Sequence, residues 1–308
     1  MNSYMFNFLV PLKVEGADAA GFLHSQLTTD VAGLASGQAG LSAWCDPKGR
    51  VIATFILARL DETYWLLQPV ALKEVFIKRL KMYVLRSAVN IVDATCAPGS
   101  CATVSVPAKD ITTLLPGLAA NPDQSVICHN DYTLVTYPAD VTTILTGREK
   151  ISRLRRAYET YFLDMDRRTL NKTSIRQGIP WLQAETSGRF LPQELNLDTL
   201  NALSFDKGCY PGQEIIARLR YRGEVKRYLC YATTENRTPL EPGAGLVSQE
   251  EGKNIGAVVN STVTDKGQEL LVVLERDHIE SGKVIVKDIP GCLLRVYDDY
   301  DHSISSSH

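Results

Sequence analysis

The residue best suited to reactive-thiol chemistry is Cys209, which lies in the segment KGCYPGQE, residues 207–214. Two glycines and a proline within five positions do not suit the interior of a helix or strand, so the segment is predicted to be a tight loop. The neighbouring cation of Lys207 favours the reactive thiolate form of the cysteine. The alternative is a buried cysteine in a structural turn, because a free cysteine often behaves as a small apolar residue.

Polar and cationic groups follow the cysteine closely. Gln213 and Glu214 supply an amide and a carboxylate. Five cations come next: Arg218, Arg220, Arg222, Lys226 and Arg227. Cations at this density could contact phosphates, or they could form a solvated surface.

The pattern of the chain changes near residue 227. Before it, helical and strand-like patterns alternate, which favours an α+β fold. The expected helices are 18–27, with Asp18 as N-cap, 69–83, 109–115 and 149–164; the expected strands are 41–45, 51–60, 64–68, 89–92, 102–106, 125–129 and 133–137. After it, strand-like runs at 228–233, 256–263, 270–274, 283–286 and 293–297 alternate with turn clusters. These runs predict a small all-β barrel.

We therefore expect two α/β subdomains over residues 1–227, a β-barrel over 228–298 and a disordered, serine-rich tail over 299–308. With 308 residues, 44% of them hydrophobic, the chain can bury a substantial core. Its net charge of −2 means that a nucleic-acid contact would need a local basic patch. The chain shows no signal- or transit-peptide pattern and no run near the ~20 apolar residues of a membrane span. These features predict a cytoplasmic protein without a membrane partner.

The other cysteines are expected to be structural. The seven cysteines are odd in number and include no CxxC pair, which fits a reducing cytosol and predicts no metal site. Cys230 and Cys292 lie in apolar runs typical of a core. Cys45 has Asp46 beside it, which would raise the pKa of that thiol.

The segment KGCYPGQE and the arginines after it resemble the signature of the YgfZ-type folate-binding proteins, relatives of the aminomethyltransferase of glycine cleavage. The resemblance covers most of the chain. It extends to Gly178-Ile179-Pro180, Phe190–Leu197, Gly16-Ala17-Asp18, Phe22-Leu23, Thr29-Asp30 and Cys45–Arg50. It implies a three-domain ring in which two interwoven α/β units and a C-terminal β-barrel enclose a central folate site. The implied cofactor is tetrahydrofolate, with or without a polyglutamate tail.

The resemblance also implies roles for individual residues. Cys209 would be the functional thiol. The matching positions implied to bind folate are Lys207, Tyr210, Gln213, Glu214, Arg218 and Arg222. A single thiolate cannot build a four-ligand iron–sulfur site, so a cluster contact would be transient or shared with a partner.

Two features of the aminomethyltransferase pattern are missing. Ala53 and Thr54 stand where that enzyme carries the carboxylates that act on the folate nitrogen, so the general base is missing. Arg176 stands where a glutamate binds the pterin ring, and a guanidinium cannot accept the pterin N–H donors. Gln177 or Glu194 could substitute for that glutamate. These departures favour a non-enzymatic role.

The function expected is a folate-binding accessory protein for iron–sulfur cluster assembly or repair, with downstream effects on tRNA modification. Its partners would be iron–sulfur proteins or their assembly factors. One alternative is a folate-dependent one-carbon transferase or demethylase acting on a small amine. A third possibility, less favoured, is direct tRNA binding through the cations of residues 218–227.

Overall fold

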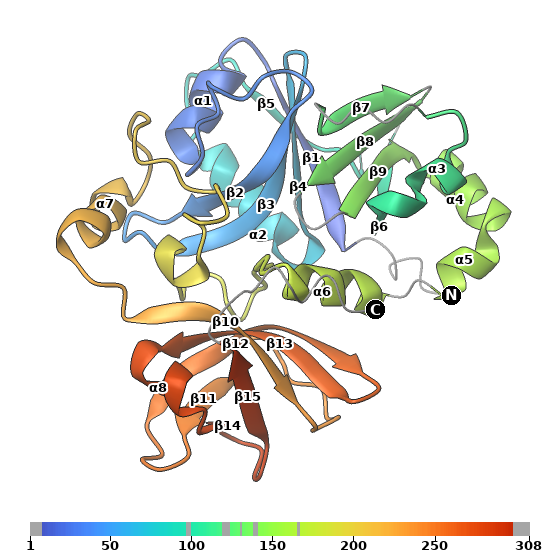
Figure 1. Ribbon diagram of the computed structural model, residues 1–308. Coiled ribbons are helices and arrows are strands. Elements are labelled where there is room, and N and C mark those ends of the chain that lie inside the picture. Colours follow the sequence, from blue (N-terminus) through green and yellow to red (C-terminus); the bar gives the residue numbers. More distant parts are fainter. Residues whose placement is uncertain are drawn as a thin grey trace.

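The computed structural model describes residues 8–96, 100–118, 124–129, 131–137, 141–164 and 167–297. Within them the strands form a five-stranded sheet, a four-stranded sheet and a closed six-stranded barrel. In Figure 1 the two sheets lie in the upper part of the view and the barrel lies below them. The predicted α+β class with a C-terminal β-barrel is therefore confirmed. The expected tail over residues 299–308 lies outside the described residues.

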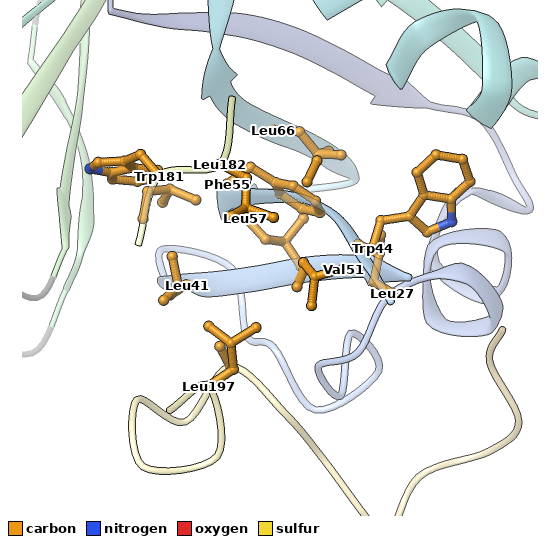
Figure 2. Packing of buried hydrophobic residues seen from close by; sticks show 14 of the residues in the cluster. Leu27, Leu41, Trp44, Val51, Phe55, Leu57, Leu66, Trp181, Leu182 and Leu197 are labelled. Atoms are coloured by element: carbon orange, nitrogen blue, oxygen red, sulfur yellow. The ribbon is translucent and has the colours of Figure 1, made fainter. Parts of the chain in front are cut away.

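The five-stranded sheet is antiparallel, with strand order β2-β3-β4-β1-β5. Its strands are β1 (Leu9–Glu15), β2 (Ala39–Cys45), β3 (Val51–Leu60), β4 (Thr63–Pro69) and β5 (Asn90–Asp93); its helices are α1 (Ala19–Gln26), η1 (Val70–Leu72) and α2 (Lys73–Met82). The ring of Phe76 on α2 meets those of Trp44 and Phe55 at centroid distances of 5.5 and 5.2 Å. Figure 2 shows this core, to which Leu182 and Leu197 from the later chain also belong. Cover on both faces explains why β3 is apolar along most of its length.

The four-stranded sheet has its own core. Its order is β6-β9-β8-β7, and all of its pairs are antiparallel. Its elements are β6 (Cys101–Pro107), η2 (Ala108–Asp110), α3 (Ile111–Leu114), β7 (Val126–His129), β8 (Tyr132–Tyr137), β9 (Val141–Gly147), α4 (Arg148–Ala157) and α5 (Glu159–Asp164). Ile151 and Leu154 of α4 are buried in the same cluster as Val104 and Ile144 of the sheet. The helix predicted over residues 149–164 is divided at Tyr158.

The barrel closes in the order β10-β13-β12-β11-β14-β15. Its elements are β10 (Arg227–Thr234), β11 (Gly245–Ser248), β12 (Asn254–Thr264), β13 (Gly267–Glu275), α8 (Arg276–Ser281), β14 (Val284–Val286) and β15 (Leu293–Tyr297). Cys230 and Cys292 are each 2% exposed in its core, as predicted. Between the sheets and the barrel the chain forms α6 (Arg167–Arg176), η3 (Pro192–Leu195) and α7 (Gln213–Arg222).

Several elements were not predicted, namely the strands β1, β9 and β11 and the helices α6, α7 and α8. β1 contains Pro11, which usually argues against a strand, but pairing with β5 begins only at Leu12. Asp18 precedes α1 without a side-chain cap bond, because its carboxylate accepts the amide of Ala88 at 2.7 Å. None of the helices in the described part of the chain is long and apolar enough to span a membrane.

Candidate functional site

The loop that carries Cys209 ends before the last two residues of the KGCYPGQE segment. Gly212 adopts φ +82° and ends the loop, so Gln213 and Glu214 form the first turn of α7. A Cβ on Gly212 would lie 2.5 Å from Gly49 Cα and 2.6 Å from the Asp46 carbonyl oxygen. Both the conformation and this backbone contact therefore require glycine.

The surface that Gly212 contacts is the turn between β2 and β3. Asp46 Oδ1 accepts the amides of Lys48 and Arg50, each at 2.9 Å, and Gly49 has φ +75°. The turn predicted over residues 46–49 is thus rigid. Two motifs that are far apart in the sequence meet here through their backbones.

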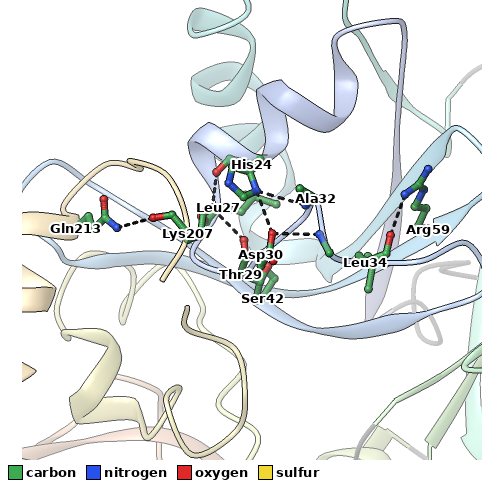
Figure 3. Close-up of polar contacts among 11 residues, drawn as sticks. His24, Leu27, Thr29, Asp30, Ala32, Leu34, Ser42, Arg59, Lys207 and Gln213 are labelled. Carbon is green, nitrogen blue, oxygen red and sulfur yellow. Dashed lines mark hydrogen bonds and ion pairs between the residues drawn. The ribbon is translucent and has the colours of Figure 1, made fainter. Parts of the chain in front are cut away.

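Lys207 holds the loop to the end of α1. Its Nζ donates to the carbonyl oxygens of His24, Leu27 (2.6 Å) and Thr29 (3.0 Å), as Figure 3 shows. These bonds use the three ammonium donors on carbonyls at and after the helix terminus, where a cation is favourable. Burial lowers the pKa of Lys207 to about 8, and Asp30 opposes this shift. Lys207 is therefore an anchor of the loop rather than a free cation beside Cys209.

Tyr210 is the apolar anchor of the same loop. It is 6% exposed in the main core, and Lys207 Nζ lies 5.0 Å from its ring centroid. Its buried hydroxyl has no hydrogen-bond partner among the described residues, and burial raises the pKa of this phenol. Gln213 Nε2 closes the loop by donating to the Lys207 carbonyl at 3.3 Å.

Cys209 is exposed, in contrast to Cys45. Burial, helped by Asp46, raises the pKa of the Cys45 thiol, which suppresses its thiolate. Of the six other cysteines expected to be structural, Cys45, Cys230 and Cys292 are buried, whereas Cys96 and Cys128 are exposed. Cys209 differs from these two in lying on an anchored loop.

The remaining residues of the motif lie on α7. Glu214, Arg218 and Arg222 are exposed, and none of them has an ion-pair partner in the described part of the chain. Arg220 stacks on Phe205 with 4.1 Å from its guanidinium carbon to the ring centroid. Ile216 is the buried residue of this helix.

Gln177 and Glu194 precede the cysteine loop in the chain, and each lies in a different local structure. Gln177 is partly exposed just after α6. Glu194 accepts the Leu191 amide at 2.8 Å and so caps its own turn. The neighbouring Gln193, which sequence reasoning did not single out, donates to the Ile216 carbonyl at 2.8 Å and ties η3 to α7. Folate binding by Gln177 and Glu194 remains a prediction.

Ala53 and Thr54, where the resemblance implies carboxylates, have structural roles here. Ala53 and Thr54 are fully buried. Thr54 Oγ1 donates to the Pro180 carbonyl at 2.6 Å and lies 3.2 Å from the amide of Leu182, which donates to it. Trp181, which follows Pro180 in the chain, forms two hydrogen bonds with Asn260 of the barrel. Its amide donates to Asn260 Oδ1 at 2.9 Å, and Asn260 Nδ2 donates to its carbonyl oxygen at 2.8 Å.

Arg176 has a partner in the barrel. Its guanidinium forms a bidentate pair with Glu269, with distances of 2.7 and 2.8 Å. Lys172 lies 3.8 Å from the same carboxylate, whose side chain is 9% exposed. Arg176 thus joins α6 to β13, and the pair raises its pKa.

A cavity of about 250 Å³ lies beside β2 and β3. It is lined by Thr29, Asp30, Leu34, Gly40, Leu41, Leu57, Asn201, Leu203 and Ser204. None of these residues belongs to the barrel. Asp30 also faces His24 Nδ1 at 3.3 Å, so the cavity and the end of α1 share one carboxylate. No group of His, Cys, Asp and Glu side chains suited to a metal ion occurs among the residues that the structure describes.

Comparison with known proteins identifies similar sequences and a similar fold. Residues 6–105 match the family model of the GCVT N-terminal domain. The fold is similar to that of the glycine cleavage system aminomethyltransferase T from Bartonella henselae, with a TM-score of 0.74, 18% identity and coverage of 96% of this chain and 84% of that one. This likeness supports the three-domain fold expected from the sequence.

Closer similarity is found to proteins named tRNA-modifying protein YgfZ. The protein of Klebsiella pneumoniae (strain 342) is 29% identical over 294 residues, covering 93% of this chain and 86% of the relative. That of Enterobacter sp. (strain 638) is 30% identical over 279 residues, covering 88% and 84%. This identity and coverage show that the chain belongs to the YgfZ family of tRNA-modifying proteins.

Proposed function

We propose that the protein binds a reduced folate and supports the assembly or repair of iron–sulfur clusters, and thereby the modification of tRNA. The name of its relatives supports the connection to tRNA. The observation that carries the proposal is the contrast between the exposed Cys209 on its anchored loop and the buried, hydrogen-bonded Thr54. A thiol is available for chemistry, whereas a transferase base is not.

Tetrahydrofolate is the proposed cofactor, and the cavity beside β2 and β3 fits part of it. Asp30, Asn201 and Ser204 offer acceptors for ring N–H donors, and leucines provide an apolar surface. The cavity is below the roughly 300–1,000 Å³ of sites that bury a drug-sized ligand, so it would take the bicyclic ring and leave the remainder outside. Arg218 and Arg222 are exposed cations that could bind a polyglutamate tail.

Calorimetric titration with tetrahydrofolate tests the cofactor. We expect measurable heat and a raised unfolding temperature, both weakened in Asp30→Asn. The matched control is Asp131→Asn, which changes an exposed carboxylate outside the cavity. The absence of both heat and a thermal shift at millimolar folate would exclude folate binding.

A deletion strain tests the cellular role. The wild-type chain should restore iron–sulfur enzyme activity and tRNA thiolation, and Cys209→Ala should not. Cys128→Ala, which alters another exposed cysteine, is the matched control and should complement. Full complementation by Cys209→Ala would exclude a functional thiol at this position. The partners would be cytoplasmic iron–sulfur proteins or their assembly factors.

Direct tRNA binding is a second candidate, favoured by one observation. Arg218, Arg222 and the 68%-exposed Tyr221 share the surface of α7, and arginines with an exposed aromatic ring suit single-stranded RNA. Arg218→Glu combined with Arg222→Glu should abolish a salt-dependent tRNA complex. Lys78→Glu with Lys81→Glu on the exposed part of α2 is the control and should not.

A further inference from the structure

The imidazole of His24 lies beside the cysteine loop. His24 is in the last turn of α1, and Lys207 binds its carbonyl oxygen. A Cβ on Gly208 would lie 3.5 Å from His24 Nε2. This ring nitrogen therefore faces the backbone of the residue that directly precedes Cys209.

The other ring nitrogen has two partners that suit different protonation states. His24 Nδ1 lies 3.3 Å from Asp30 Oδ1 and 3.3 Å from the amide nitrogen of Ala32, as Figure 3 shows. When Nδ1 is unprotonated it accepts the Ala32 amide, and the hydrogen of the neutral ring is then on Nε2. When Nδ1 carries the hydrogen it donates to the Asp30 carboxylate, which itself accepts the Gly33 amide at 3.1 Å, and Nε2 is then free to accept a proton.

Lys207 cannot serve as the direct partner of the thiol. Its three donors are engaged with the carbonyls of His24, Leu27 and Thr29. The same bonds hold the loop against α1 and so fix His24 beside it. Cys209 is exposed and free of such an anchor, so its side chain can turn toward the imidazole.

We propose that His24, held by Asp30, is the acid–base partner of Cys209. In the neutral tautomer whose Nδ1–H is bound by Asp30, the thiol proton passes to Nε2, which leaves a thiolate beside an imidazolium. Among the residues that the structure describes, the charged groups in contact with His24 are Asp30, at Nδ1, and Lys207, at the backbone carbonyl. This inference rests on the proposed role of Cys209 as the functional thiol.

Iodoacetamide alkylation of the purified protein, followed residue by residue by mass spectrometry between pH 5.5 and 9, tests the pair. Cys96 and Cys128 are exposed and serve as internal references. At pH 6.5, Cys209 should react faster than both, and His24→Gln should slow it by about tenfold without changing the references. Asp30→Asn should slow it less.

Gly208→Ala is a further variant that removes no titratable group. Its methyl would meet His24 at ordinary contact distance, so the chain should fold, but the methyl would occupy the space at Nε2 beside the loop. We expect slower alkylation of Cys209 in this variant as well. A purely structural His24 would lower the unfolding temperature while leaving the pH profile of Cys209 unchanged.

Two results would overturn the inference. One is a wild-type Cys209 that reacts with the same pH profile as Cys96 and Cys128, a measurement that needs no variant. The other is a folded His24→Gln protein with unchanged Cys209 reactivity. Both results are independent of complementation. If Cys209→Ala fails to complement but His24→Gln leaves the alkylation of Cys209 unchanged, the proposed function stands and His24 is rejected as the acid–base partner of Cys209.

Discussion

The cysteine loop and the region around Thr54 use polar groups in opposite ways. In the loop, Lys207 and Tyr210 are anchored and Cys209 is left exposed. Around Thr54, the hydroxyl is buried and satisfied by backbone groups of the segment after α6. A polar group that is fully paired and buried contributes to stability and specificity, whereas an exposed group on a rigid support remains available to a partner.

The region around Thr54 connects parts of the fold. At the positions where the resemblance to aminomethyltransferases implies carboxylates, this chain has groups that join the first sheet to residues 180–182. Asn260 and the pair of Arg176 with Glu269 extend these connections to the barrel. This region joins the sheets to the barrel, and the exposed thiol of Cys209 lies outside it.

The largest effect is expected from restoring a carboxylate at the junction. Thr54→Asp would bury an acceptor-only group against the Pro180 carbonyl, so we expect a loss of ~3–5 kcal/mol in the free energy of unfolding and no aminomethyl transfer. Urea denaturation measures the loss. Thr54→Ser keeps the hydroxyl and should cost far less. A stable, transferase-active Thr54→Asp protein would contradict the assignment of this region as a junction.

The next effect concerns the contact between the loop and the β2–β3 turn. Gly212→Ala meets both a positive φ and backbone atoms within 3 Å, so a loss of about 3 kcal/mol is expected. Gly117→Ala is the matched control, because Gly117 has φ +87° with nothing within 4 Å, and it should lose about 1 kcal/mol from strain alone. Equal losses in the two variants would mean that the backbone contact is unimportant.

A smaller, pH-dependent effect is expected at Lys207. Its pKa of about 8 in the folded protein lies below the ordinary value of 10.5, so between these two values the unfolded chain binds more protons than the folded one. The free energy of unfolding therefore rises with pH across that window. Below pH 8 the cost of burying the charge is fully present.

Lys207→Met removes both the burial cost and the three hydrogen bonds. The stability difference between wild type and variant should therefore be small near pH 7 and grow toward pH 10. Thermal unfolding at a series of pH values measures it. A difference that shrinks as the pH rises would show that the ammonium form is the one stabilised by folding.

The smallest effect on stability is expected at the thiol. Cys209→Ala should change the free energy of unfolding by less than ~0.5 kcal/mol, because the side chain is exposed. Cys45→Ala, at a buried position, should cost about 1 kcal/mol. Thermal melts of the two variants compare them directly. A Cys209→Ala protein that loses more stability than Cys45→Ala would make Cys209 a structural residue.

Several features could be predicted from sequence because their signals are local. Strands 51–60 and 270–274 follow from short apolar runs, the turn at residues 46–49 from its proline and glycine, and the barrel from repeated short strands. α7 was not predicted, since Ile216 is the only residue of that helix to be buried and its apolar periodicity is weak. β1 was not predicted because it contains Pro11. A strand accommodates a proline there only because pairing with β5 begins at the next residue.

The residue types alone identify the chemical groups: a cysteine in a loop shaped by glycine and proline, and Ala53, Thr54 and Arg176 at positions where the resemblance implies acids. Packing of the folded chain sets what those groups contact. It directs Lys207 to the end of α1 rather than to the thiol, pairs Arg176 with Glu269, and brings His24 to Gly208. The reason is physical: local patterns reflect backbone preferences and burial over a few residues, whereas contacts between residues up to 183 positions apart arise only when whole elements pack together.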